Sequence, residues 1–192
     1  NKITEISKVF FPHSLGIFYQ AITQMLGFNN YGDEYKMMGL SAYGTARFTK
    51  ELEKTITITG NGQFELNLRY FDHHKCGNPF EIVNGVPMVK RLFSRHLEAL
   101  LVKQRCSKEP VEEIHKDIAA SAQAVYEKIF FYLLDYAWQK TKLPSIFISG
   151  GCAMNSLANG KINENSNFET VVIPPSPGDA GGAVGAALHA LS

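Results

Sequence analysis

A short apolar run that ends in two neighbouring glycines constrains the fold of this chain most strongly. Residues 146–148 have the length and β-branched character of a buried parallel strand, and Gly150 and Gly151 follow after one serine. Glycine accepts positive φ and has no Cβ, so an anionic ligand can approach the backbone there. Residues 155–162 are expected to form a helix whose first N–H groups face such a ligand. Phosphate binding and a simple tight turn are the two interpretations of this strand–turn–helix unit.

A second glycine-rich stretch follows the next expected strand, at residues 169–173. The proline-rich connector 174–177 leads to a helix predicted over 178–188, in which four positions are glycine. Each glycine destabilises a helix interior by about 1 kcal/mol relative to alanine, which indicates close approach of a backbone or a ligand. Asp179 stands at the start of this helix, outside the carboxyl end of its strand, where open α/β sheets bind ligands. A helix-capping carboxylate is the alternative interpretation of Asp179.

Composition bounds the class of protein. The chain has 192 residues, a hydrophobic fraction of 45% and a net charge of +1, which suits one globular domain or two small lobes and gives no electrostatic argument for nucleic-acid or membrane partners. The longest apolar run, 129–138, is too short to cross a bilayer. Three cysteines without metal-type spacing indicate reduced thiols and a cytoplasmic location. The first residue is not Met, so we expect a processed chain or an excised fragment.

The first forty residues predict a strand and a helix. Residues 3–11 alternate loosely and are expected to form a strand. His13 or Ser14 caps a helix over 15–25, where apolar residues recur at the spacing of one helix face. Gly16 in the first turn suits an anion or a nucleotide, and a merely capped helix is the alternative.

The middle of the chain predicts a hairpin and, before it, a short helix that Asp33 and Glu34 are expected to start. Lys36 is the one cation of a tyrosine- and glycine-rich stretch, 31–44, where it either reaches a phosphate or stays solvated. Residues 55–59 and 63–68 alternate with period two around Gly-Asn-Gly, which predicts a β-hairpin. Two histidines and Cys76 lie in the segment 71–76, for which a loop is favoured over a metal site because no second cluster exists.

Two further helices are expected before the glycine strand. Apolar residues on one side predict a helix over 86–102, and the strongest helical pattern of the chain runs from 114 to 136. His115 at its start is expected to be a surface or capping residue. The order of elements, with parallel strands at the end, indicates an α/β fold elaborated by the hairpin.

Four motifs together resemble the O-carbamoyltransferases of nodulation-factor and antibiotic biosynthesis. They are Phe11-Pro12-His13-Ser14-Leu15-Gly16, Asp33-Glu34-Tyr35-Lys36 with Met38-Gly39-Leu40, Ser149-Gly150-Gly151-Cys152-Ala153-Met154-Asn155, and Gly178-Asp179-Ala180-Gly181-Gly182-Ala183. The resemblance covers nearly the whole chain. It implies the second lobe of an actin, Hsp70 and sugar-kinase type of nucleotide-binding fold, as a single domain over 1–192 that is a fragment of a longer enzyme. It also implies a relation to the proteins that build threonylcarbamoyl-adenosine on tRNA.

The resemblance also implies site residues. Asp179 would be a ligand of a divalent metal, commonly iron in that family, and Lys36 or His13 would neutralise charge or assist proton transfer. Gln20 replaces the ribose-binding aspartate of the tRNA-modifying relatives, which puts a ribose contact there in doubt. The expected nucleotide-binding residues are Ser14, Gly16, Gly150, Gly151, Asn155 and Gly178.

The expected activity follows from the same resemblance. Carbamoyl phosphate and ATP would form carbamoyl-adenylate, which a hydroxyl group of a small-molecule acceptor attacks. The family's other metal ligands, two histidines separated by three residues, are absent, so we expect this chain alone to be inactive and to need the remaining lobe. Apolar surface left for that lobe would favour a homo-oligomer. A sugar-kinase-like phosphotransferase and a non-catalytic nucleotide-binding module are the alternatives.

Overall fold

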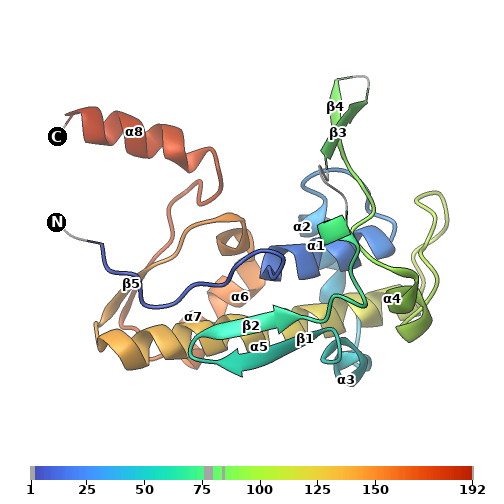
Figure 1. The fold of residues 1–192 in the computed structure, drawn as a ribbon, viewed down its shortest axis with the longest axis horizontal. Helices are drawn as coiled ribbons and strands as arrows, with labels where there is room; N and C mark the ends of the chain where they lie inside the picture. The colour runs from blue at the N-terminus through green and yellow to red at the C-terminus, as the bar shows by residue number, and fades with distance from the viewer. Residues whose placement is uncertain (1–2, 76–79, 84, 192) are drawn as a thin grey trace. The chain divides into compact units, whose positions relative to one another are not determined.

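The computed structural model describes residues 3–75, 80–83 and 85–191. The chain has two compact parts, Asn1–Ile129 and Phe130–Ser192. The boundary between them falls inside one continuous helix, α5 (Glu113–Thr141), which is labelled in Figure 1. The described residues contain helices and three two-stranded sheets, which confirms a mixed α/β chain. None of the helices among the described residues is long and apolar enough to cross a membrane.

The first part contains a series of short helices and two antiparallel hairpins. In chain order its elements before α5 are α1 (Leu15–Met25), α2 (Glu34–Ser41), α3 (Thr49–Leu52), β1 (Ile56–Gly60), β2 (Gln63–Leu66), the 3₁₀ turn η1 (His73–Lys75), β3 (Phe80–Val83), β4 (Val86–Val89) and α4 (Arg95–Leu100).

Helix α1 has the bounds that the sequence predicts. Its N-cap is Ser14, whose hydroxyl accepts a hydrogen bond from the N–H of Ile17 at 3.3 Å. Gly27 follows the helix with a φ of +82°, a conformation that favours glycine and ends helices. The apolar face is buried, with Phe18 and Ile22 both at 0% exposure. Capping and periodicity therefore fix this helix locally, before any tertiary contact is considered.

Helix α5 forms the other side of this core. The hydroxyl of Tyr19 in α1 donates to Oε1 of Gln123 in α5 at 2.8 Å, in a buried position. The rings of Tyr19 and Tyr126 meet edge to face, with centroids 5.2 Å apart. A buried tyrosine hydroxyl needs such an acceptor, so the pair orients α1 on α5 as well as packing it.

The loop after α2 is held tightly against the start of α5. The N–H of Thr45 donates to Oδ1 of Asp117 at 2.6 Å, and Arg47 forms an ion pair with the other carboxylate oxygen. The hydrogen bond from Thr45 and then the guanidinium of Arg47 lower the pKa of Asp117. A Cβ on Gly44 would lie 2.1 Å from the carbonyl oxygen of Lys116, so only glycine allows this approach.

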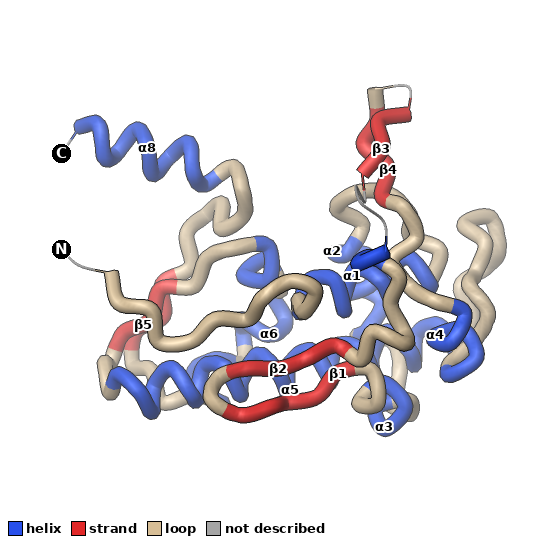
Figure 2. The backbone as a smooth tube through the Cα atoms, in the orientation of Figure 1, coloured by secondary structure: helices blue, strands red, loops and turns tan. Residues whose placement is uncertain are grey.

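The expected strand over residues 3–11 is wrong. The segment is irregular, as its loop colouring in Figure 2 shows, and only side chains tie it to the hairpin β1–β2. Ser7 donates its hydroxyl to the carbonyl of Asn61 at 2.9 Å, and Gln63 donates to the carbonyl of Lys8 at 3.1 Å. Among the residues that the structure describes, no strand pairs with its backbone, and Phe11 is 77% exposed. The alternation therefore has neither a ladder nor a covered face to stabilise a strand.

The hairpin β1–β2 confirms the sequence prediction. The two strands are antiparallel, with Ile56 opposite Leu66 and Ile58 opposite Phe64. Its turn contains Gly60, Asn61 and Gly62, all with positive φ. Glycine and asparagine tolerate that conformation at little cost, which is why the Gly-Asn-Gly signal locates the turn correctly.

The expected helix over 86–102 is wrong in its first half. Residues Val86–Val89 form β4, which pairs with β3 in antiparallel register, and α4 starts only at Arg95. Pro87 has no N–H to donate and so disfavours a helix interior, whereas Ser94 caps α4 by accepting from the N–H of His96 at 3.1 Å. The cap, rather than the apolar spacing, marks the true start of the helix.

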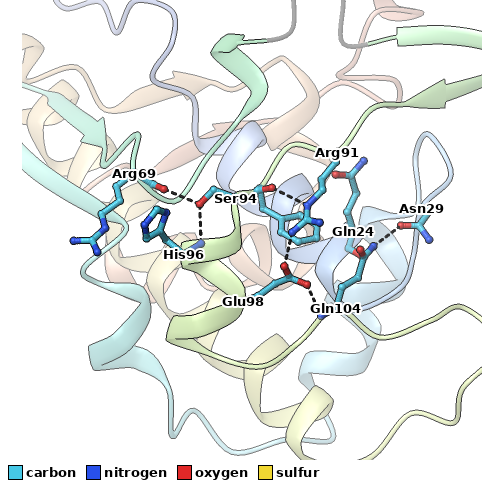
Figure 3. Close-up of polar contacts among 9 residues, drawn as sticks. Gln24, Asn29, Arg69, Arg91, Ser94, His96, Glu98 and Gln104 are labelled. Carbon is cyan, nitrogen blue, oxygen red and sulfur yellow. Dashed lines mark hydrogen bonds and ion pairs between the residues drawn. The ribbon is translucent and has the colours of Figure 1, made fainter.

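A buried side chain from α1, that of Gln24, which is labelled in Figure 3, fixes the segment between β4 and α4. Gln24 donates to the carbonyls of Val89 and Lys90 at 3.2 and 3.1 Å, and accepts from the N–H of Leu92 at 3.0 Å. One amide therefore satisfies three backbone groups of an irregular stretch. Satisfied buried polar groups specify one backbone path, which apolar packing alone does not.

The same close-up shows how the end of α4 is closed. The carboxylate of Glu98 accepts from the N–H of Gln104 at 3.0 Å and pairs with Arg91. These two partners, the backbone hydrogen bond foremost, lower the pKa of Glu98. The side chain of Gln104 in turn donates to the carbonyl of Gln24 at 3.2 Å, so this network returns to α1.

The second part is a parallel strand pair with short helices. Pairing of Ile146 with Val171 and of Phe147 with Val172 confirms the predicted parallel arrangement. Beyond α5, its elements are β5 (Ser145–Phe147), the 3₁₀ turn η2 (Gly151–Met154), α6 (Ser156–Gly160), α7 (Ile162–Asn165), β6 (Thr170–Val172) and α8 (Gly181–Leu191).

Helix α8 starts three residues later than the sequence predicts. The N–H of Gly181 bonds the carbonyl of Gly178 at 3.0 Å, and that of Gly182 bonds the carbonyl of Asp179 at 3.1 Å. Gly178 and Asp179 thus lie in a turn before the helix. None of the side chains described in α8 is buried, although the helix is apolar.

We predict opposite effects of alanine at two glycines of the α2 region. Gly44→Ala should lower the free energy of unfolding by about 1–3 kcal/mol, because the new methyl group meets the backbone of Lys116. Gly39→Ala, inside α2 with no atom within 4 Å of the added Cβ, should raise it by up to about 1 kcal/mol. Urea unfolding of the two variants measures both changes, and equal midpoints would contradict the close approach at Gly44.

Candidate nucleotide-binding site

The two glycine-rich turns of the second part are in direct contact. The N–H of Gly150 donates to the carbonyl of Pro177 at 2.7 Å, and the hydroxyl of Ser149 donates to the same oxygen at 2.9 Å. Gly150 has a φ of +98°, which an L-residue rarely adopts. Because the β5–β6 pair is parallel, both turns leave the sheet at the same edge, and this double hydrogen bond fixes the distance between them.

The glycines of these turns fall into two groups. A Cβ on Gly181 would lie 2.2 Å from the carbonyl of Ser176, and one on Gly178 would lie 2.7 Å from the methyl group of Met154. The backbone contact at Gly181 requires glycine, whereas the flexible side chain of Met154 could move away from a Cβ on Gly178. Around Gly150 and Gly151 no atom lies within 4 Å of the added Cβ, so the space above this turn is open.

Asn155 has a structural task in this unit. It is 7% exposed, and its Oδ1 accepts from the N–H of Ala158 at 3.0 Å, which caps α6. Asn159 reaches back to the carbonyl of Ala153 at 2.7 Å and closes the η2 turn onto the helix. The expected contact between Asn155 and a nucleotide stays a prediction, as do those of Gly150, Gly151 and Gly178.

Asp179 is exposed at the turn before α8. Within residues 3–75, 80–83 and 85–191, no three His, Cys, Asp or Glu side chains form a group that could hold a metal ion. One exposed carboxylate does not make a metal site, so the described residues alone do not fit the expected iron. The role of Asp179 as a ligand stays a prediction that depends on further donors.

In the first part, His13 and Ser14 lie at the start of α1. The N–H of Leu66, the last residue of β2, donates to Nδ1 of His13 at 3.1 Å. Ser14 caps the helix, and Gly16 lies in its first turn, half-buried. The structure therefore brings these three expected residues together and gives the cap to Ser14 rather than to His13.

His73 holds the other side of this segment. It is 3% exposed, and its Nε2 lies 2.7 Å from the carbonyl oxygen of Pro12, 61 residues away in the chain. Its ring contacts the edges of Phe11 and Phe71, with centroids 5.8 and 6.1 Å apart. Burial is the main reason why the pKa of His73 is lowered. The sequence favours a loop here, and the described residues form the turn η1; Cys76 lies outside them.

Lys36 is held by its own helix. Its ammonium group forms an ion pair with Asp33 at 2.7 Å, and Asp33 also accepts from the N–H of Asn30 at 3.1 Å. The hydrogen bond to Asp33 raises the pKa of Lys36. A protonated, positioned ammonium fits charge neutralisation rather than proton abstraction, which narrows the two roles that the resemblance implies.

Glu34 is a site feature that sequence reasoning missed. It was expected only to start α2, yet burial raises the pKa of its carboxyl group, with the neighbouring charge of Asp33 acting in the same direction. Gln20 of α1 donates a hydrogen bond to it. The carboxylate therefore lies at the α1–α2 contact, and only the pairing of distant helices reveals this.

Comparison with known proteins places the chain in a family. Residues 1–188 match the family described as "Carbamoyltransferase N-terminus". The chain is 34% identical over 189 residues to the protein sll1178 of Synechocystis, which covers 98% of this chain and 29% of that protein. It is 30% identical over 181 residues to nodulation protein NolNO of Sinorhizobium fredii, covering 93% of the chain and 23% of NolNO. For nodulation protein NolO of Bradyrhizobium diazoefficiens the identity is 29% over 187 residues, 96% of the chain and 30% of NolO.

The chain therefore belongs to the carbamoyltransferase family, which confirms the resemblance drawn from its four motifs. It spans between 23% and 30% of the length of these three relatives. The relatives are thus much longer proteins than this chain.

We predict that Gly181→Ala loosens the contact between the two glycine-rich turns. The new Cβ would meet the carbonyl of Ser176 and displace the connector that carries Pro177. Hydrogen exchange at the Gly150 amide should then become roughly fivefold faster, since it loses a hydrogen bond worth about 1 kcal/mol. Gly185→Ala, also in α8 but with open space around the added Cβ, is the control and should leave that rate unchanged.

We predict that His73 makes stability depend on pH. Its pKa is lowered in the folded chain, so between that value and about 6.5 the unfolded chain binds more protons. Stability should thus be full above about pH 6.5 and fall as the pH drops through this window. His115, whose burial also lowers its pKa, acts in the same direction. The difference between the wild type and His73→Gln isolates His73, and identical pH profiles would contradict its burial as a neutral ring.

Proposed function

We propose that this chain is the nucleotide-binding part of an ATP-dependent carbamoyltransferase. The reaction would move a carbamoyl group from carbamoyl phosphate, through carbamoyl-adenylate, to a hydroxyl group of a small molecule. Family membership supports a transferase. The observation that carries the nucleotide site is the hydrogen bond from Gly150 to Pro177, which joins the two glycine-rich turns at one edge of the strand pair.

The open space over Gly150 and Gly151 supports a phosphate or adenylate at this turn. No side chain of the described residues fills it, and any residue other than glycine would narrow it. Contacts at Ser149, Met154 and Gly178 join the two turns, so a ligand would meet a preformed surface. Holding two reactants in a fixed geometry lowers a bimolecular barrier by several kcal/mol, roughly 7 or more at best.

Charge neutralisation is the role we propose for Lys36. The ion pair with Asp33 fixes the ammonium group, and its raised pKa keeps it protonated. When the acceptor hydroxyl attacks the carbamoyl carbon, the bond from that carbon to the AMP oxygen breaks and negative charge moves onto AMP. A cation near the phosphate favours that step electrostatically.

Asp179 would contribute one oxygen to a divalent metal, and the remaining ligands would come from the rest of the parent protein. The bound metal would supply Lewis-acid polarisation of the phosphate or carbamoyl group. The surface of α8 supports a further lobe as partner: Val184, Leu188 and Leu191 are 58%, 63% and 85% exposed. Contiguous apolar surface of this kind marks an interaction site.

We predict that the parent protein forms a carbamoylated product only with both ATP and carbamoyl phosphate, and releases AMP. Asp179→Ala should abolish turnover and lower the bound metal, because it removes a hard oxygen ligand. Glu164→Ala, an exposed carboxylate of the same part, is the matched control and should change neither. The 192-residue chain alone should show no turnover.

Each alternative has its own signature in this assay. A phosphorylated acceptor without carbamoyl phosphate would identify a kinase-like enzyme. ATP binding with neither turnover nor metal in the parent would identify a non-catalytic module. Normal metal content and turnover in Asp179→Ala would remove the metal assignment.

A further inference from the structure

Two histidines hold residues Pro12 and His13 from opposite directions. The backbone N–H of Leu66 in β2 donates to Nδ1 of His13 at 3.1 Å. His73 in η1 lies with its Nε2 2.7 Å from the carbonyl oxygen of Pro12. The hairpin and the 3₁₀ turn thus both fasten the dipeptide that immediately precedes the cap of α1.

These contacts fix where each imidazole carries its proton. A backbone N–H can only donate, so Nδ1 of His13 must offer a lone pair, and the neutral ring carries its hydrogen on Nε2. A carbonyl oxygen can only accept, so the Nε2 of His73 must be protonated as well. Both rings are therefore assigned the Nε2–H tautomer by their partners.

The surroundings of His73 keep its ring neutral. Its buried Nδ1 has no hydrogen-bond partner among the described residues, and the edges of Phe11 and Phe71 lie against the ring. A second proton would add a charge and an unsatisfied N–H in an apolar environment. Of the titratable groups nearby, His13 and His74 disfavour that charge.

The remaining charged groups near His73 form a pair of their own. Asp72 favours the charged form of His73, but burial outweighs it and the pKa of His73 is lowered overall. The carboxylate of Asp72 is bound by Lys75 at 2.7 Å, which offsets its negative charge. Taken together, burial and the neighbouring groups stabilise the neutral ring of His73, which donates to the carbonyl of Pro12.

We infer that His13 serves as a neutral hydrogen-bond donor through its Nε2–H, held in position by His73, and not as a general base. With Nδ1 occupied by Leu66 and Nε2 protonated, the neutral ring has no free lone pair to accept a proton. An N–H donor suits an anionic oxygen, such as that of a phosphate or a carbamoyl phosphate. His73 is a positioning residue in this arrangement. The choice of ligand rests on the proposed function, whereas the tautomers do not.

The tautomers are tested directly in the 192-residue chain by ¹H–¹⁵N correlation spectra of the histidine rings. Near neutral pH, both His13 and His73 should show a protonated Nε2 and an unprotonated Nδ1. A protonated Nδ1 on either ring would overturn the assignment. The exposed ring of His96, which lies outside this cluster, serves as the internal reference for the spectra.

The positioning role of His73 is tested by two substitutions. His73→Phe keeps a ring but loses the donor, and should make hydrogen exchange at the Leu66 amide roughly fivefold faster or more. His73→Gln restores a donor without a titratable group, and should restore slow exchange across the acidic range. His96→Gln is the control. Equal exchange rates in His73→Phe and the wild type would contradict the positioning role of His73.

The donor role of His13 is tested in the parent protein with His13→Asn. Asparagine keeps an acceptor near the Leu66 N–H but has nothing in place of Nε2–H. The KM for ATP or for carbamoyl phosphate should rise roughly tenfold or more, because a hydrogen bond to a charged oxygen is lost. Unchanged kinetic constants would overturn the donor role. A parent protein without carbamoyl transfer would instead contradict the proposed function, while the spectra of the chain still decide the tautomers.

Discussion

The hydrogen bond between Gly150 and Pro177 is the constraint on which the candidate site depends. A pair of three-residue parallel strands offers few ladder bonds, so loop contacts beyond the strand ends determine how the turns lie. The carbonyl of Pro177 accepts from both Ser149 and Gly150, and this places two segments that are distant in sequence at one edge. The contact between the turns is therefore made by backbone groups and one hydroxyl, while Asn155 and Asn159 hold the η2 turn to α6.

The first part uses a different principle. There, single polar side chains fasten irregular segments: Gln24 holds the residues after β4, Asp117 holds the loop after α2, and His73 holds Pro12. Each is buried and hydrogen-bonds to backbone groups of its segment, and so each selects one backbone path among many of similar apolar content. The same chemistry that fixes the path at His73 also fixes the protonation state of its ring, which links folding to the properties of the site.

Local signals account for what the sequence predicts correctly. A serine cap, a C-terminal glycine and a clean apolar face define α1, and Gly-Asn-Gly between alternating residues defines the hairpin. The strand–glycine–helix unit at Gly150 is recognisable for the same reason. Apolar spacing misleads at two places. Residues 3–11 have the alternation of a strand but no neighbouring strand among the described residues. Residues 86–94 have helical spacing, but Pro87 disfavours a helix and the cap lies later, at Ser94.

The candidate site was predictable only in its backbone elements. The turns at Gly150 and Pro177 are recognisable in the sequence as glycine and proline runs. The burial and the pKa shifts of His73 and Glu34, in contrast, depend on partners in other elements. No spacing in the sequence links His73 to a carbonyl 61 residues away. Burial and hydrogen bonding, which change a titratable group most, are set by tertiary contacts that a linear pattern does not encode.

Helix α8 has a consequence for how such a protein matures. An isolated helix of 11 residues is marginal in water, and none of the side chains described in α8 is sheltered. If the further lobe proposed above covers it, the order of α8 would depend on that lobe, and this segment would fold last. Chaperones and proteases recognise exposed apolar segments, so a protein whose α8 stays uncovered would be a substrate for them.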